Sequence, residues 1–309
     1  MESNDICYLC GEKAVLQLSH IIPSFVVGWL KSTSGTGFMR RGNTPNLRVQ
    51  DGLKRYLLCN ECEQRFNKWE TPFAEEIFVP LHQERANKFI KYGPWLEKFA
   101  VSVSWRVLIL FKLDGYLSGF PPNLVPAVDK ALKTWKEFLL GERPHPGRFE
   151  HHMLLLGPIQ ETTLLTGLPP NINRYLLRHI HTDVAYSETK AFVYIKLCRI
   201  LLVGFIEMPN PNEWEGTKLR VKTGTFQSRD QTYIIPDYLG DYLMESARKT
   251  HIVLQSISER QKKRIEEIYM LDLDRAAESE SFRAMTYDVM MFGDAAFEQL
   301  ESENDKKEE

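Results

Sequence analysis

Four of the five cysteines in this 309-residue chain stand in two tight pairs, an arrangement that suits a metal ion. The pairs are Cys7-x2-Cys10 and Cys59-x2-Cys62, whereas Cys198 stands alone. Zinc takes four soft ligands in tetrahedral geometry, and two such pairs supply four thiolates from short turns. We therefore predict a structural Zn²⁺ site at Cys7, Cys10, Cys59 and Cys62. The alternative is four buried or redox-active cysteines without a metal.

The segment between the cysteine pairs adds a second signal. CYLCG is followed by SHIIP, which carries a His-x-x-Pro, with nine residues between Cys10 and His20, and the second pair lies in LLCNECEQRFNKWE. This order resembles the HNH endonucleases, the ββα-metal nucleases whose zinc-binding members place His-x-x-Pro between two CxxC pairs. The resemblance covers roughly residues 7–78. It implies an N-terminal module of two strands and a helix that hydrolyses phosphodiester bonds.

The resemblance assigns His20 as the general base that takes a proton from water, at the end of a strand. Imidazole suits this role because it readily exchanges a proton near neutral pH. Pro23 would fix the turn that leaves the strand. Taken alone, a histidine in this setting is more often structural or a spare zinc ligand.

The resemblance also implies a catalytic divalent metal near the histidine. Ser19 stands where the family commonly has an acid or a second histidine, and it is a poor magnesium ligand. Glu63 and Asn67 follow the second cysteine pair at i, i+4 spacing, so one helix face presents both. Their oxygen atoms suit Mg²⁺ or Mn²⁺. The alternative is a solvated helix face on which Glu63 pairs with a neighbouring base.

A middle asparagine orients the histidine in the family, and this chain offers no clear equivalent. Asn43 and Asn46 lie in the connecting segment, and the strand LKRYLL before the second cysteine pair has none. We predict that Asn46 is the catalytic asparagine, with Asp51 as the alternative residue for this role.

The segment from residue 31 to 55 is basic in a chain whose formal net charge is −2. Its one acid is Asp51, against six basic residues. Clustered cations bind a phosphate backbone through counterion release. We predict DNA contact by Arg40, Arg41, Arg48, Lys54 and Arg55; the alternative is ordinary surface charge.

Composition supports a globular protein rather than a membrane or secreted one. Hydrophobic residues make up 43% and charged residues 26% of the chain, as in ordinary folded domains. The polar N-terminus lacks a secretory signal, and the apolar stretches are too short to span a bilayer. We therefore expect a cytoplasmic protein with no membrane contact. In that reducing compartment, paired cysteines more often bind a metal than form disulfides.

Hydrophobic patterning predicts an α+β fold with three parts. Residues 1–82 form the zinc-stapled HNH module, with residues 35–46 as an irregular loop and a helix from Cys59 that Pro72 kinks or ends. Residues 83–297 form a larger mixed α/β domain. Residues 298–309 form a disordered acidic tail.

Within the larger domain the pattern predicts several elements. Residues 101–111 are a helix or a strand, residues 126–140 a helix that Gly141 ends, and residues 151–159 and 191–209 strands. Residues 236–271 form one long helix or two in sequence, whose run Gln261–Arg264 is a solvated face.

The sequence thus predicts a metal-dependent DNA endonuclease with structural Zn²⁺ and catalytic Mg²⁺ or Mn²⁺. Residues 83–297 would serve recognition, a partner protein or self-association. By analogy, such nucleases serve bacteria in restriction or in defence against phage. The rival prediction is a non-catalytic zinc module that binds nucleic acid or protein, and a weaker one is a nuclease for RNA.

Overall fold

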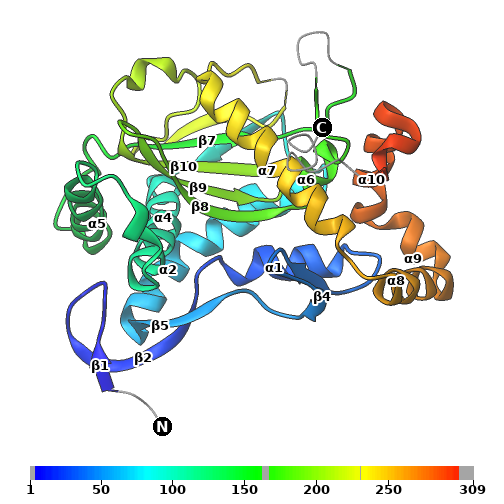
Figure 1. The fold of residues 1–309 in the computed structure, drawn as a ribbon. Helices are drawn as coiled ribbons and strands as arrows, with labels where there is room; N and C mark the ends of the chain where they lie inside the picture. Colours follow the sequence, from blue (N-terminus) through cyan, green and yellow to red (C-terminus); the bar gives the residue numbers. More distant parts are fainter. Residues whose placement is uncertain (1–3, 162–166, 230, 299–309) are drawn as a thin grey trace. The chain divides into compact units, whose positions relative to one another are not determined.

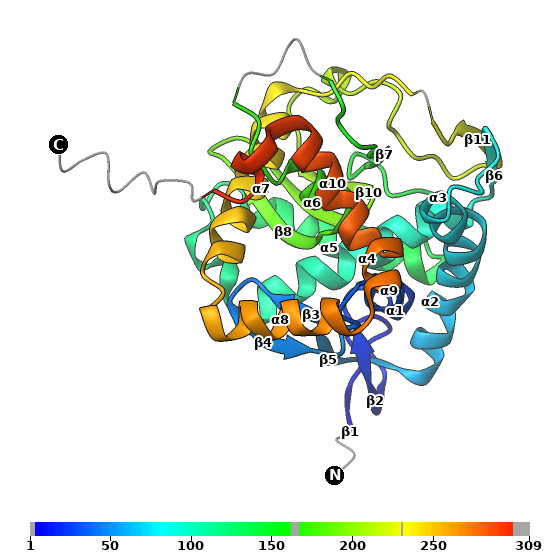
Figure 2. The same ribbon diagram turned by 90° about the vertical axis from the view of Figure 1, so that its right-hand side faces the viewer.

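The computed structural model describes residues 4–161, 167–229 and 231–298, in which helices and strands are mixed (Figures 1 and 2). The chain forms two compact units, each assembled from separate segments. The first unit comprises Met1–Val26, Gly52–Leu155 and Ile180–Ile235. The second unit comprises Val27–Asp51, Leu156–His179 and Pro236–Glu309.

The first unit begins with a small antiparallel sheet followed by a helix. Strands β1 (Asn4–Ile6), β2 (Lys13–His20) and β5 (Lys54–Cys59) pair in the order β1-β2-β5. Helix α2 (Asn60–Pro72) follows β5 directly and contacts both β2 and β5. Two antiparallel strands and a helix therefore hold the N-terminal cysteines and His20.

The sequence predicts that Pro72 kinks or ends the helix that begins near Cys59. Helix α2 ends at Pro72, but the chain stays helical beyond it. The π-helix η1 (Phe73–Phe78) continues α2, and α3 (Val79–His82) follows it. A π-turn relaxes the hydrogen-bond ladder at the point where proline cannot donate. Phe73 then stacks on Phe99 with ring centroids 3.7 Å apart, so the extension carries core residues.

A four-stranded antiparallel sheet forms the body of the first unit. Its order is β7-β10-β9-β8, and helix α4 crosses it while α5 contacts β10 (Figure 1). The sheet and its helices are β7 (His151–Leu155), β8 (Ile180–Tyr186), β9 (Ala191–Leu197), β10 (Ile200–Glu207), α4 (Trp95–Leu113) and α5 (Val125–Leu140). The strand predicted at 151–159 is confirmed over His151–Leu155, and that predicted at 191–209 is confirmed as the β9–β10 hairpin.

Two helix predictions are resolved in this unit. Residues 101–111, left open between helix and strand, belong to α4, which is buried on almost every side and so lacks a polar stripe. The stop at Gly141 is confirmed, because Gly141 caps α5 in the left-handed conformation with φ 88°. The minor elements are β6 (Phe89–Tyr92), which pairs with β11 (Gly224–Gln227), η2 (Tyr116–Gly119) and η3 (Pro211–Glu213).

The second unit is mainly helical. Ile172, Tyr175, Leu176 and Ala247 form a buried cluster between α6 and α7. The helices are α6 (Ile172–Arg178), α7 (Asp237–Gln255), α8 (Glu259–Leu271), α9 (Leu273–Glu278), α10 (Glu280–Phe292) and η4 (Gly293–Ala296). Helix α1 (Ser24–Ser32) starts in the first unit and ends in the second.

The second unit decides two predictions made from the sequence. Residues 236–271 form two successive helices, α7 and α8. The irregular loop predicted at 35–46 is wrong in part, because β3 (Met39–Arg41) and β4 (Thr44–Val49) pair as a hairpin there. Of the predicted tail, residues 299–309 lie outside the described residues.

The predicted domain boundaries after residues 82 and 297 stay predictions, and residues 83–297 contribute to both units. Among the described residues, no helix is long and apolar enough to cross a membrane.

Candidate metal centre and the strand end at His20

The first cysteine pair lies in the turn between β1 and β2. The N–H of Cys7 donates to the carbonyl of Glu12 at 2.9 Å, and the N–H of Gly11 donates to the carbonyl of Cys7 at 2.8 Å. Gly11 has φ +87°, a left-handed conformation that suits glycine. The tight turn after Cys10 therefore depends on glycine at position 11, and it brings both thiols to one side.

The second pair lies at the junction of strand and helix. Cys59 is the last residue of β5 in extended conformation, and Cys62 is in the first turn of α2. The N-terminus of a helix carries a partial positive charge, which stabilises a nearby thiolate. Because the strand runs directly into the helix, the thiols of Cys59 and Cys62 can point at a common centre from two different directions.

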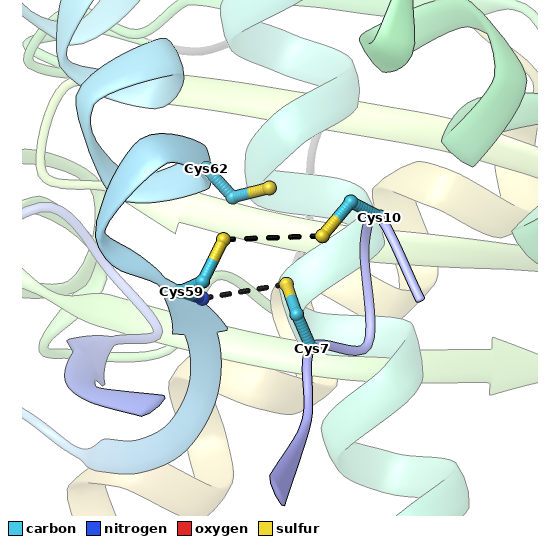
Figure 3. Close-up of side chains that lie close together, drawn as sticks. All are labelled: Cys7, Cys10, Cys59 and Cys62. Carbon is cyan, nitrogen blue, oxygen red and sulfur yellow. Dashed lines mark hydrogen bonds between the residues drawn. The ribbon is translucent and has the colours of Figure 1, made fainter. Parts of the chain in front are cut away.

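The four cysteines converge on one centre (Figure 3). Their Sγ atoms all lie within 4.8 Å of one another, and Cys10 Sγ is 3.9 Å from Cys59 Sγ. A tetrahedral zinc site with Zn–S bonds of about 2.3 Å places its sulfurs about 3.8 Å apart. The backbone N–H of Cys59 also donates to Cys7 Sγ at 3.3 Å, which favours a thiolate there. The quartet could therefore hold a metal ion such as zinc.

The thiols oppose one another's ionisation. Their hydrogen bond lowers the pKa of Cys7 to about 4 and raises that of Cys62 well above its usual range. Burial raises the pKa of Cys10. One thiolate is stabilised at the expense of its neighbours, and a bound divalent cation is what lets all four ionise together. The donor set and its spacing both fit zinc.

His20 ends β2 at the far end of the strand pair from the cysteines. It pairs with Lys54, the first residue of β5, while Leu16 pairs with Cys59 at its last. Cys59 is five positions after Lys54 on the strand, a distance of about 17 Å at the usual rise. The predicted base and the cysteine centre are therefore joined by the strands but do not share one site.

A buried arginine fixes the backbone at His20. Arg106 of α4 is 2% exposed; its Nη1 donates to the carbonyl of His20 at 2.9 Å and its Nη2 to Glu70 Oε1 at 2.6 Å. Because one planar guanidinium makes both bonds, the Glu70 carboxylate lies within roughly 8 Å of the His20 carbonyl oxygen. Glu70 belongs to the last turn of α2, so the end of this helix approaches the end of β2.

The predicted metal ligands lie on the same helix. Glu63 lies in the first turn of α2, and its Oε1 is buried without a hydrogen-bond partner among the described residues. Asn67 is exposed one turn later. Within the described part of the chain, the cysteine quartet is the one group of three or more His, Cys, Asp or Glu residues close enough for a shared ion. The pairing of Glu63 with Asn67 stays a prediction.

Sequence reasoning missed Glu70 and Arg106. Glu70 follows Glu63 by seven residues, two helical turns, so spacing alone puts both on one face of α2. Its proximity to the strand end depends on Arg106, which is 36 residues away in sequence. That long-range contact leaves no local pattern.

Ser19 and Asn46 occupy different surroundings. Ser19 is 2% exposed on the face of β2 opposite to Leu18 and Tyr56, which are 49% and 55% exposed. Asn46 belongs to the second unit, where its Oδ1 accepts a hydrogen bond from the backbone N–H of Ser258 at 2.8 Å. Asn46 therefore holds the start of α8, and its predicted catalytic role stays a prediction.

The predicted DNA-binding residues divide between the units. Arg55 pairs with Asp114 in the first unit. Lys54 belongs to the same unit and also has an interaction partner. Arg40, Arg41 and Arg48 lie on the β3–β4 hairpin of the second unit.

Comparison of the chain with protein-family models, with curated proteins and with solved structures finds no match in any of the three.

Proposed function

We propose that this chain is a metal-dependent endonuclease of the ββα-metal type, which hydrolyses phosphodiester bonds in DNA. The observation that carries the proposal is the placement of His20 at the end of the first of two antiparallel strands, with a helix after the second strand packing on both. The cysteine quartet joins the other end of the same strands to the helix. This is the order of parts that the resemblance predicts.

In this proposal His20 accepts the proton of the water that attacks phosphorus, and the zinc centre contributes stability rather than chemistry. Two strands and a helix bury little apolar surface, so a bound metal supplies folding free energy that such a small layer lacks. Arg106 holds the carbonyl of His20 and thereby limits the motion of the base. A fixed backbone keeps the imidazole aligned with the reacting oxygen.

The candidate ligands for a catalytic metal are Glu63 and Asn67, one turn apart on α2. The buried oxygen of Glu63 has no partner among the described residues, which suits an oxygen ligand for Mg²⁺ or Mn²⁺. Such an ion would stabilise negative charge on the transferring phosphate.

The test is nicking of supercoiled plasmid by the zinc-loaded full chain with Mg²⁺, with Mn²⁺ and with EDTA. We expect nicking that needs a divalent ion, and its loss in His20→Ala. His145→Ala is the matched control, because His145 is an exposed histidine outside the strand pair. Zinc content and circular dichroism of each variant show whether it is folded.

The proposal fails if folded, zinc-loaded wild-type protein leaves plasmid and single-stranded DNA intact with both ions. It fails equally if His20→Ala nicks at the wild-type rate.

A second function, a zinc module that binds without cleaving, has its own support. Ser19 is buried and offers a hydroxyl where the family has an acid or a histidine. Glu70, which Arg106 links to the carbonyl of His20, is already neutralised by Arg106. Binding of DNA by wild-type protein without nicking under any metal condition would establish this alternative.

A further inference from the structure

The β3–β4 hairpin brings two arginines into direct opposition. Arg40 pairs with Arg48 across the hairpin. Like charges placed opposite each other destabilise a strand pair. The pKa of Arg40 is lowered by burial and then by the charge of Arg48, as expected for two neighbouring cations. The hairpin therefore carries an electrostatic cost in the isolated protein.

The ring of Phe38 lies close to both guanidinium groups. The Arg48 Cζ is 4.3 Å and the Arg40 Cζ 5.4 Å from the centre of its ring. Cation–π contacts of this kind hold both side chains in place. The ring is already covered by arginines, so it serves as their support rather than as a platform for a base.

Helix α8 adds further cations. None of the residues of α8 is buried, and the first half of the helix exposes Arg260, Lys263 and Arg264. Lys262 is paired with Glu259 at 2.6 Å. No ion pair to Arg260, Lys263 or Arg264 is found within the described residues. The second half of α8 carries the acids Glu266 and Glu267, so the excess of positive charge lies in the first half of the helix.

Helix α8 lies beside the hairpin (Figure 2), and two hydrogen bonds join them. Arg40 Nη2 donates to Gln261 Oε1 at 3.0 Å, and Asn46 Oδ1 accepts from the N–H of Ser258 at 2.8 Å. The hairpin and the helix are more than 200 residues apart in sequence, so their charges add only in the folded unit. Residues 37–49 and 256–264 together carry seven basic side chains and one acid.

We infer that the hairpin and α8 form one binding surface for the phosphate backbone of nucleic acid. The contacting side chains, called here the basic face, are Arg41, Arg48, Arg260, Lys263 and Arg264. Arg40 is a positioning residue, because its donors are engaged by Gln261 and by the carbonyl of Pro45. A polyanion would relieve the repulsion between Arg40 and Arg48, which the free protein leaves unbalanced.

This inference deepens the proposed function by giving the nuclease a separate binding surface, and it rests on that function only for the choice of DNA. Contacts between exposed cations and phosphates position a protein on nucleic acid but carry no sequence information. The expected substrate class is therefore duplex DNA of any sequence. RNA presents the same phosphate chemistry and is a second arm of the test.

The test measures binding of a 25-base-pair duplex of random sequence by the full chain in EDTA, so that cleavage does not enter. The variant is Arg260→Ala with Lys263→Ala and Arg264→Ala, all exposed positions on α8. We expect affinity to fall roughly tenfold or more, and the slope of log K against log salt to become shallower by about 2 to 3, since each phosphate contact contributes about 0.9. The same measurement on duplex and single-stranded RNA identifies the preferred nucleic acid.

The control removes three exposed lysines elsewhere: Lys91, Lys130 and Lys133. It should leave both affinity and salt slope unchanged. A second variant, Arg260→Lys with Arg264→Lys, keeps the charge and should keep most of the binding. His20→Ala should bind like the wild type, so loss of cleavage and loss of binding are separable.

The inference is overturned if the α8 variant binds DNA and RNA with the wild-type salt slope. It is overturned too if wild-type protein binds neither nucleic acid but binds vesicles of phosphatidylserine, since the surface would then serve an anionic membrane.

Discussion

The ion pair between Arg106 and Glu70 gives the sharpest prediction about the strand end at His20. Glu70→Ala leaves the guanidinium of Arg106 buried, at 2% exposure, without its counter-charge. Arginine stays protonated in proteins, so the charge cannot be removed by deprotonation. Breaking such a pair costs about 3–5 kcal/mol, and the 15% exposure of the Glu70 side chain favours the lower figure.

The assay is urea unfolding of zinc-loaded protein followed by tryptophan fluorescence. We expect Glu70→Ala to lose about 3 kcal/mol of unfolding free energy, which corresponds to a fall in Tm of roughly 6–12 °C. Glu75→Ala is the matched control, because Glu75 is an exposed acid one turn further along. Its effect should stay within about 0.5 kcal/mol.

A double-mutant cycle isolates the pair from the hydrogen bond to His20. Arg106→Met removes the buried charge together with the bond to the His20 carbonyl. In the double variant Glu70→Ala, Arg106→Met, no charge is left unpaired, so its destabilisation should be clearly less than the sum of the single effects. Additive effects, or a Glu70→Ala protein within about 1 kcal/mol of wild type, would refute the reasoning.

Further predictions concern the metal, the turn and a buried acid. Cys10→Ser should lower bound zinc, measured by elemental analysis, from one per chain to well below half, whereas Cys198→Ser should not change it. Gly11→Ala should cost about 1–2 kcal/mol, measured by urea unfolding, because φ +87° strains any residue with a Cβ. Glu97 is 4% exposed and burial raises its pKa to about 7. In the unfolded chain this carboxyl ionises near pH 4.5, so the folded state holds the extra proton between about pH 4.5 and 7, and its contribution to stability is lost as pH rises through that window. Glu97→Gln should flatten this part of the stability profile, and an unchanged profile would contradict the assignment.

Local signals made the cysteine centre predictable from sequence. The CxxC spacing and Gly11 determine each turn within a few residues, so nothing distant is needed to recognise the pairs. The stop of α5 at Gly141 is local for the same reason. The helical spacing of apolar residues after the second pair also predicts that a helix begins near Cys59, where β5 leads directly into α2.

Contacts between distant segments explain what the sequence could not supply. The β3–β4 hairpin lies in a Gly- and Asn-rich segment that has no strand pattern, and α8 supports it through Arg40 and Asn46. The run Gln261–Arg264 has the pattern of a solvated helix face. Its proposed role in binding follows only from its position beside the hairpin. Helix α4 gave no helical period because it is buried on nearly all sides.

Glu63 and Asn67 show the same limit at the candidate site. Their i, i+4 spacing is visible in the sequence, but whether an ion lies between them depends on what faces α2. The unpartnered oxygen of Glu63 is the structural observation that favours a ligand role.

The central claim is that His20 acts as the base of a metal-dependent nuclease. Its most direct test is the single-turnover rate of plasmid nicking with Mn²⁺ by His20→Ala, compared with wild type at equal zinc content. We predict a loss of about 10²–10⁴-fold, the usual contribution of a general base, with His145→Ala at the wild-type rate. An unchanged rate in folded, zinc-loaded His20→Ala protein would contradict the claim.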